Sequence, residues 1–191
     1  EKTDVTDFWV LGGLPGGKDK WNLKRVNEDE VEINYKGLSG ENAYSGKKSL
    51  KLDIELKRGG WCCWHAPIKP MIPVGKGGDI FLSGRLLLSH VPPGVEVSIG
   101  VNIKCPGTSA SMVIKYDQSQ VSPDDWTFLK YDTYTVAKRM IEKHHFDPAN
   151  MYISHWYVQL RAKKKFSGER VIIYLDDIRI GPKSQKDTLV K

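Results

Sequence analysis

Tyr157, Gln159 and Arg161 stand on every second residue of one short segment. Alternate side chains of a β-strand point to the same face, so this spacing places an aromatic ring, a planar amide and a guanidinium side by side. The ring offers a flat apolar surface for stacking, and the amide and the guanidinium make paired hydrogen bonds. Together they suit a ligand that combines apolar C–H faces with many hydroxyl groups.

Other segments carry side chains of the same types. Arg85 and Asn102 occupy outward positions of two further alternating runs. Asn102 is accompanied by Ser98 and Gly100, whose small side chains would leave space for a ligand. If these strands share one sheet, its second face is a polar concavity, but the sequence does not give the strand order. Each of these positions is equally compatible with an ordinary solvated sheet face.

Two indoles flank the cysteine pair Cys62-Cys63. Trp61 and Trp64 are three residues apart and would lie on opposite faces of a strand, so we expect one in the core and the other available for stacking. We favour Trp61 as the stacking residue. Trp126 and Trp156 are expected in the core.

The composition describes one large globular domain. The chain has 191 residues, of which 40% are hydrophobic and 27% charged. No stretch approaches the roughly 18 apolar residues that a membrane span requires. The net charge is +6, but the basic residues are dispersed, so we expect neither a membrane nor a nucleic acid as partner. The chain begins with Glu1, which indicates that an upstream segment has been removed.

The cysteines fit neither a disulfide scaffold nor a zinc site. There are three of them, and the pair Cys62-Cys63 with a distant Cys105 lacks the CxxC spacing of zinc ligands. One bridge from Cys105 to Cys62 or Cys63 is feasible in an oxidising compartment. Buried unpaired thiols are the alternative.

Strict alternation of apolar and polar residues, broken by Gly, Pro, Asn and Asp, is the dominant pattern. It predicts antiparallel strands within the segments 49–56, 80–88, 95–105, 112–116, 154–161 and 171–180. Helical periodicity is present only over 136–144. Many strands at short spacing are typical of a β-sandwich or a barrel, so we expect an all-β fold. The polar residues 183–191 predict a tail or the start of a linker.

One carboxylate breaks the alternation of the last strand. Ile172, Tyr174 and Ile178 share a parity, and Asp176 falls on it, which predicts that Asp176 points to the core side. A buried carboxylate needs a cation or several hydrogen bonds. A calcium ion, a salt bridge, and a strand-end carboxylate that accepts backbone amides are the three solutions we consider.

Three segments resemble one family. The run YLDDIRI over 174–180 resembles the closing strand of β-jelly-roll carbohydrate-binding modules of the galactose-binding-like type, in the group that holds families four, nine, sixteen and twenty-two. The run AYSGKKSLKL over 43–52 resembles their early turn and strand, and WTFLKY over 126–131 resembles their late Trp-led strand. The motifs occur in the expected order. The resemblance implies one antiparallel β-sandwich (jelly roll) domain over residues 1–182.

The resemblance also implies a structural calcium ion. In that group the ion joins an acidic residue of the opening segment, the early turn and an Asp of the closing pair. Carried over by position, the ligands are Asp7 (or Asp4), the turn from Ser45 to Lys48, and Asp176. The acid of Asp7 precedes an aromatic residue here, which departs from the order usual in the group.

The function that this resemblance implies is that of a non-catalytic carbohydrate-binding module. It would be secreted and monomeric, and it would hold an attached catalytic domain at a plant or algal polysaccharide. The expected ligand residues are Trp61, Trp64, Arg85, Asn102, Tyr157, Gln159 and Arg161. The two arginines tilt the expected ligand toward uronic or sulfated glycans, although neutral chains use the same residue types.

Two alternatives remain open. A jelly-roll polysaccharide lyase would need Arg, Gln, His and Tyr to converge, and Arg85, Gln159, His155 and Tyr157 are of suitable types. The strand signatures of jelly-roll glucanases and alginate lyases are absent, however. A cell-surface adhesion module of the same fold, which binds protein, is the other alternative.

Overall fold

The structure is a computed structural model, and it describes residues 9–10, 24–26, 30–57, 61–74, 80–115, 125–162 and 168–182. The strands of one sheet are β1 (Trp9–Val10), β3 (Val31–Ser39), β4 (Ser49–Leu56), β6 (Ile80–His90), β9 (Thr127–Asp132) and β11 (Glu169–Pro182). Those of the other are β2 (Lys24–Val26), β5 (Trp61–Pro73), β7 (Val95–Cys105), β8 (Thr108–Lys115) and β10 (Tyr152–Ala162). The helical elements with described bounds include α1 (Thr133–His144) and the 3₁₀ turn η3 (Pro148–Asn150).

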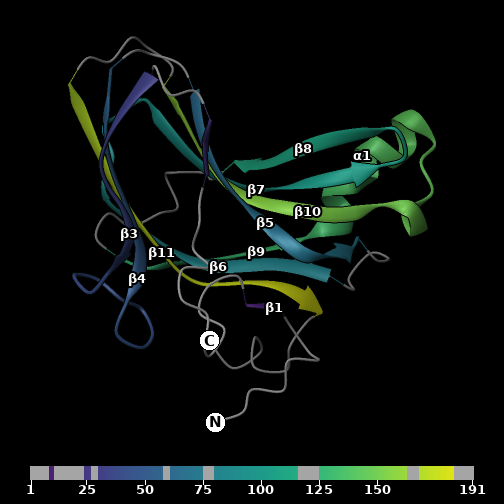
Figure 1. Cartoon of the computed structure of the whole chain (residues 1–191), viewed down its shortest axis with the longest axis horizontal. Helices are drawn as coiled ribbons and strands as arrows, with labels where there is room; N and C mark the ends of the chain where they lie inside the picture. The colour runs from purple at the N-terminus through teal and green to yellow at the C-terminus, as the bar shows by residue number, and fades with distance from the viewer. Residues whose placement is uncertain are drawn as a thin grey trace.

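The two sheets are stacked as a sandwich (Figure 1). The first sheet has the order β3-β4-β11-β6-β9, with β1 paired to β11, and the second has the order β2-β5-β10-β7-β8. All of these pairings are antiparallel. The predicted all-β sandwich is therefore confirmed.

The alternation predicted the strand bounds well where it was unbroken. The segments 49–56 and 95–105 form β4 and β7 with the predicted bounds. The helix begins at Thr133 rather than at residue 136, because Asp132 caps it: the Tyr134 N–H donates to the Asp132 carboxylate at 3.0 Å.

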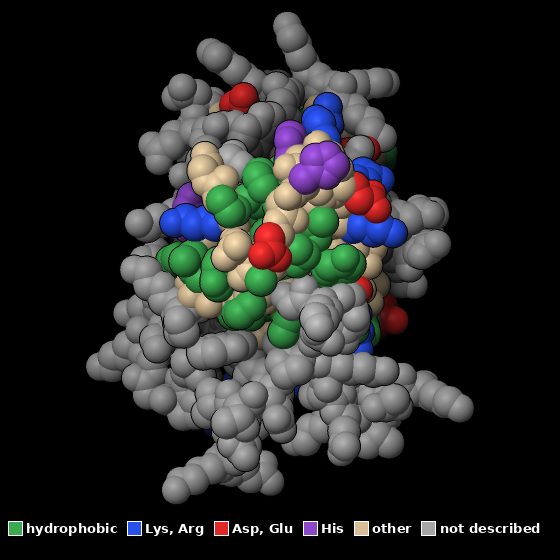
Figure 2. All heavy atoms as spheres, turned by 90° about the vertical axis from the view of Figure 1, so that its right-hand side faces the viewer, with side chains coloured by type: hydrophobic (Ala, Val, Ile, Leu, Met, Phe, Trp, Pro, Cys, Tyr) green, Lys and Arg blue, Asp and Glu red, His purple; other side chains and the backbone are tan. Residues whose placement is uncertain are grey.

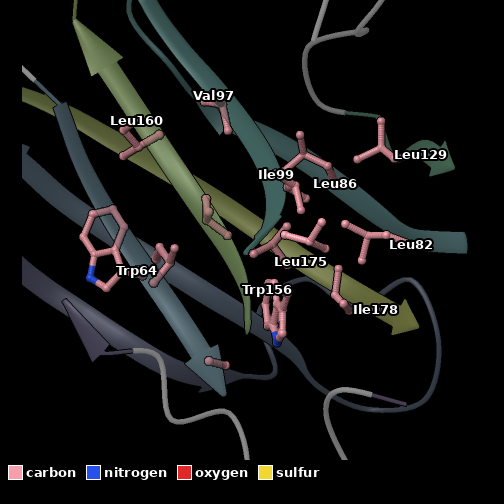
Figure 3. Close-up of a cluster of buried hydrophobic side chains, with 14 of the residues drawn as sticks. Trp64, Leu82, Leu86, Val97, Ile99, Leu129, Trp156, Leu160, Leu175 and Ile178 are labelled. Atoms are coloured by element: carbon pink, nitrogen blue, oxygen red, sulfur yellow. The ribbon is translucent and has the colours of Figure 1, made fainter. Parts of the chain in front are cut away.

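Apolar side chains from both sheets fill the space between them (Figure 3). Trp64 from β5 and Trp156 from β10 are 0% and 1% exposed and are among the largest fully buried side chains. The prediction that Trp156 belongs to the core is confirmed. The same prediction for Trp126 is wrong, because Trp126 is half-buried, lies outside the core cluster and packs edge to face with Tyr44. No disulfide joins Cys62, Cys63 and Cys105, and Cys62 and Cys105 lie in this core, so the alternative of buried thiols is the one observed.

The prediction that Asp176 points into the core is wrong, because β11 contains a bulge. Val171, Ile173 and Leu175 fill the core, so Asp176 begins on the outer face together with Tyr174. The register with β6 shifts between Asp176 and Arg179, and Asp177 has a φ of 49°. The extra residue reverses the parity, as bulges do, and returns Ile178 to the core.

A layer of paired charges covers the outer face of β4. Asp53 is only 3% exposed, and its two oxygens accept hydrogen bonds from Arg170 at 2.8 and 2.6 Å. Lys51 lies 3.8 Å from Asp53 and 2.7 Å from Glu41. The hydrogen bonds from Arg170 hold the pKa of the Asp53 carboxyl below its usual range.

The helix α1 closes one end of the sandwich (Figure 1). Ala137 is buried, and Met140 and Ile141 pack against the core. Figure 2 looks onto this end, where histidine, basic and acidic side chains lie beside apolar ones. His144 and His145 are exposed. No helix in the described ranges has the length and apolar character that crossing a membrane requires.

We expect Asp53→Asn to lower the melting temperature at pH 7 by about 5 °C, because charged hydrogen bonds to a buried carboxylate are lost. The folded-state pKa of Asp53 is lowered, so its stabilisation is complete above the unfolded value of about 3.9 and is lost as the pH falls through the lower folded value. The difference between variant and wild type should therefore shrink in melts at about pH 2.5. Glu32→Gln is the matched control, since the Glu32–Lys57 pair is exposed. A deficit for Asp53→Asn that stays constant with pH would contradict this account.

Candidate functional site

The outer face of the second sheet gathers most of the predicted ligand residues. In the register of β5, β10 and β7, Gln159 lies between Cys63 and Ser98, Tyr157 lies between His65 and Gly100, and Arg161 lies between Trp61 and Glu96. The residues between them on each strand belong to the core, so these side chains face away from it. We call this surface the β10 face, and its side chains are Cys63, His65, Glu96, Ser98, Asn102, His155, Tyr157, Gln159 and Arg161. The condition that the strands share one sheet is met for β10 and β7, but not for β6, which carries Arg85 in the other sheet.

Access to the β10 face varies along the strands. Arg161 is exposed, and Gln159, Asn102 and His155 are half-buried. The small residues Ser98 and Gly100 are buried between them. The accessible polar groups are therefore the Arg161 guanidinium and, in part, the Gln159 and Asn102 amides and the His155 ring.

Asn102 is held in place by its neighbours. Its amide oxygen and its backbone carbonyl accept hydrogen bonds from the Ser154 hydroxyl at 3.1 and 3.2 Å. The Ser154 oxygen also lies 3.0 Å from Nδ1 of His155. The contact fixes the orientation of the Asn102 amide before any ligand binds, which lowers the entropic cost of binding.

Tyr157 cannot act as the stacking surface that the sequence predicted. It is only 5% exposed, and it lies on the central strand between His65 and Gly100. Its hydroxyl is buried and has no hydrogen-bond partner among the described residues. Burial raises the pKa of Tyr157 well above its ordinary value, and burial raises the pKa of the neighbouring Cys63 thiol to about 11.

Two of the predicted ligand residues do not lie on this face. Trp64 is fully buried between the sheets, so it cannot contact a ligand (Figure 3). Arg85 lies on β6 in the first sheet, opposite Phe128 and Asp176. The backbone of Trp61 lies opposite Arg161 in β5, and its side chain is outside the described part of the structure. The role of Trp61 therefore stays a prediction.

Three residues of the β10 face were not predicted from the sequence, namely Cys63, His65 and Glu96. The rings of His65 and His155 lie edge to face with centroids 5.2 Å apart. The signal for His65 was its parity with Trp61, but Pro67 and Pro70 disguise the strand, since proline is typical of turns and strand edges. Glu96 was visible as an outward position of 95–105 but was not assigned to the site.

The early turn meets the closing acidic pair, as the resemblance implied. The backbone N–H groups of Tyr44 and Ser45 donate to one oxygen of Asp176 at 2.8 and 3.0 Å. The Asp177 N–H donates to the other oxygen at 2.8 Å, and the Ser45 hydroxyl donates to Asp177 at 2.8 Å. Asp176 thus accepts backbone amides, which is the third of the three solutions considered for it.

These contacts do not resemble a calcium site. Calcium binds oxygen atoms, whereas the groups aimed at Asp176 are N–H donors. Lys48 is exposed in the turn, and Asp7 lies outside the described residues. Over the described ranges, no three His, Cys, Asp or Glu side chains are grouped so that they could hold a metal ion. The calcium ion stays a prediction.

No family model and no curated protein matches the sequence. Solved structures match the fold. A structure of carbohydrate-binding modules from the β-sandwich superfamily, described for their promiscuous specificity, has a TM-score of 0.63 and 13% sequence identity. The match covers 93% of this chain, which spans only 64% of that one.

Two further structures match at similar levels. A family 11 carbohydrate-binding module from Clostridium thermocellum, in complex with a β-1,3-1,4-mixed-linked tetrasaccharide, has a TM-score of 0.54 at 8% identity, over 92% of this chain and 95% of that one. The Endo-D glycoside hydrolase domain from Streptococcus pneumoniae R6 has a TM-score of 0.53 at 11% identity, over 87% of this chain and 22% of that one. The likeness is one of fold: this chain is a β-sandwich of the kind found in carbohydrate-binding modules.

Proposed function

We propose that this chain is a non-catalytic carbohydrate-binding module and that the β10 face is its glycan-binding surface. The observation that carries the proposal is the register that places Gln159, Arg161 and Asn102 together on one face. The sequence had selected these residues for their hydrogen-bonding geometry before the strand order was known. The fold shared with carbohydrate-binding modules supports the proposal, although a fold alone does not establish a function.

Each accessible group has a specific role in this proposal. Gln159 and Arg161 donate paired hydrogen bonds to sugar hydroxyls, and the fixed Asn102 amide adds a third contact. The Trp61 indole, opposite Arg161 in the register, provides the stacking surface. Each new hydrogen bond replaces one to water, so the affinity should be weak to moderate.

The preference for acidic glycans that the sequence suggested loses its basis on this face. It rested on two arginines, but only Arg161 lies here, and Glu96 stands opposite it in the register. The charges of Arg161 and Glu96 offset one another, so we expect the β10 face to bind neutral chains.

We further propose that the module is secreted and monomeric and that it holds an attached catalytic domain at its polysaccharide. The match to the Endo-D glycoside hydrolase domain supports the attachment, since the matching part is 22% of a larger catalytic chain.

The lyase alternative is disfavoured by the geometry. Its four residues do not converge, because Arg85 lies in the other sheet. A catalytic tyrosine must exchange protons near the working pH, whereas burial raises the pKa of Tyr157 and removes its hydroxyl from solvent.

Native affinity electrophoresis against neutral and acidic polysaccharides tests the proposed function. We expect Arg161→Ala and Gln159→Ala each to weaken the retardation by neutral glycans about tenfold, since each removes a pair of hydrogen bonds. Both variants should keep the melting temperature of the wild type. Arg139→Ala, which removes an exposed arginine on α1, is the matched control and should bind like the wild type.

Two results would contradict the proposed function. New reducing or unsaturated sugar ends after incubation would identify an enzyme. Failure of every neutral and acidic polysaccharide to retard the protein would favour the adhesion alternative.

Calcium removal is a separate test. If Asp176 acts as an acceptor of backbone amides, Asp176→Asn lowers the melting temperature by several degrees in the presence of either calcium or EDTA, because three N–H groups lose a charged acceptor. If a calcium ion is bound as the resemblance implies, EDTA lowers the melting temperature of the wild type and has no further effect on the variant.

A further inference from the structure

The outer face of the first sheet carries a second cluster of aromatic and basic side chains, on the opposite side of the sandwich from the β10 face. Its members are Tyr44 from the early turn, Arg85 from β6, Trp126 from the start of the β9 segment and Phe128 from β9. We call it the Arg85 cluster. Tyr44 and Phe128 are 43% and 41% exposed, which is unusual for large aromatic side chains that already have a packing partner.

Arg85 lies against two of these rings. The centre of its guanidinium is 4.2 Å from the centroid of the Tyr44 ring and 4.6 Å from that of the Phe128 ring. At these distances both rings make cation–π contacts with the guanidinium, whose N–H groups lie in its own plane and can still donate hydrogen bonds. No hydrogen bond or ion pair joins Arg85 to another side chain in the described ranges.

The surroundings keep this geometry fixed. The Tyr44 N–H is bound to Asp176, and the Tyr44 ring meets Trp126 edge to face, with centroids 6.0 Å apart. Asp176 lies opposite Arg85 in the register, but its oxygens already accept backbone N–H groups and it is 7% exposed. The oxygens of Asp176 are therefore engaged by backbone amides rather than by Arg85, so the N–H groups of Arg85 stay available for a ligand.

We propose that the Arg85 cluster is a second glycan site and that it takes an acidic sugar, namely a uronate or a sulfated residue. The carboxylate or sulfate accepts hydrogen bonds from the N–H edge of Arg85. The apolar face of the sugar ring packs on the exposed parts of Tyr44 and Phe128. The class of ligand rests on the proposed function, whereas the site itself rests on the geometry of the cluster.

Native affinity electrophoresis can separate the two sites if each acidic polysaccharide is paired with a neutral form. Suitable probes are polygalacturonate with its methyl ester, and dextran sulfate with dextran. We expect Arg85→Gln and Phe128→Ala to weaken binding of the acidic probes about tenfold or more and to leave the neutral probes unaffected. Arg85→Lys keeps the charge but loses the planar group, so it should fall between the wild type and Arg85→Gln.

Lys130→Gln is the matched control for charge. It removes one positive charge from β9 on the same sheet. Lys130 lies over the Phe81 ring, whereas Arg85 lies against the rings of Tyr44 and Phe128. Equal losses for Arg85→Gln and Lys130→Gln would overturn the proposal, because general attraction to a basic surface would then explain the binding. A purely structural role for Arg85 would lower the melting temperature without changing the ratio of acidic to neutral binding, and it would also overturn the proposal.

The remaining outcomes are equally decisive. If the acidic polysaccharides fail to retard the wild type, the assignment to a glycan is overturned. Polyglutamate, an acidic polymer without sugar rings, gives the second check: if it alone retards the protein, and the retardation depends on Arg85, the assignment is also overturned. Gln159→Ala distinguishes the two faces: loss of neutral binding in that variant with acidic binding retained supports both sites. If neutral glycans never bind while the dependence of acidic binding on Arg85 holds, the proposed function of the β10 face fails and the Arg85 cluster stands.

Discussion

The outer surface of the first sheet depends on one carboxylate. Asp176 sits where β11 bulges, and two of the N–H groups that it accepts come from the early turn. A buried carboxylate without hydrogen-bond donors would lower the stability of the fold by several kcal/mol, and the backbone amides of the early turn also need acceptors. The hydrogen bonds between Asp176 and the turn meet both needs. They hold Tyr44 against Arg85, at the bulge that returns Ile178 to the core.

The second sheet owes its properties to the central position of β10. β10 lies between β5 and β7, so each of its outward side chains has a neighbour on both sides. Tyr157, near the middle of the strand, is buried, whereas Arg161, near its end, is exposed. The residue types were therefore a poor guide to their roles. The Tyr157 ring is part of the buried sheet surface, and the accessible contacts come from polar side chains such as Arg161 and Gln159.

The fold could be predicted from the sequence where a strand has one continuous buried face. β4 and β7 alternate without interruption, so their bounds were correct. β5 was missed because its prolines imitate turn signals, and the parity of β11 failed at Asp177, whose positive φ no alternation pattern encodes. The site could be predicted only in part, because strand order is set by long-range pairing. Gln159, Arg161 and Asn102 met on adjacent strands, and Arg85 was placed in the other sheet.

The two arginines show why strand order decides chemistry. Arg161 and Arg85 are equal in charge and in donor geometry. Arg161 lies near the exposed end of β10, and Glu96 lies opposite it in the register. The negative charge of Glu96 offsets the positive charge of Arg161. Arg85 also has a carboxylate opposite it, but the oxygens of that group accept backbone amides, and two aromatic rings lie against the guanidinium. In the proposed sites, the first environment suits exchange of hydrogen bonds with neutral hydroxyls, and the second leaves the N–H groups of Arg85 available beside apolar surface. The same side chain is therefore proposed to bind two kinds of sugar on opposite faces of one sandwich.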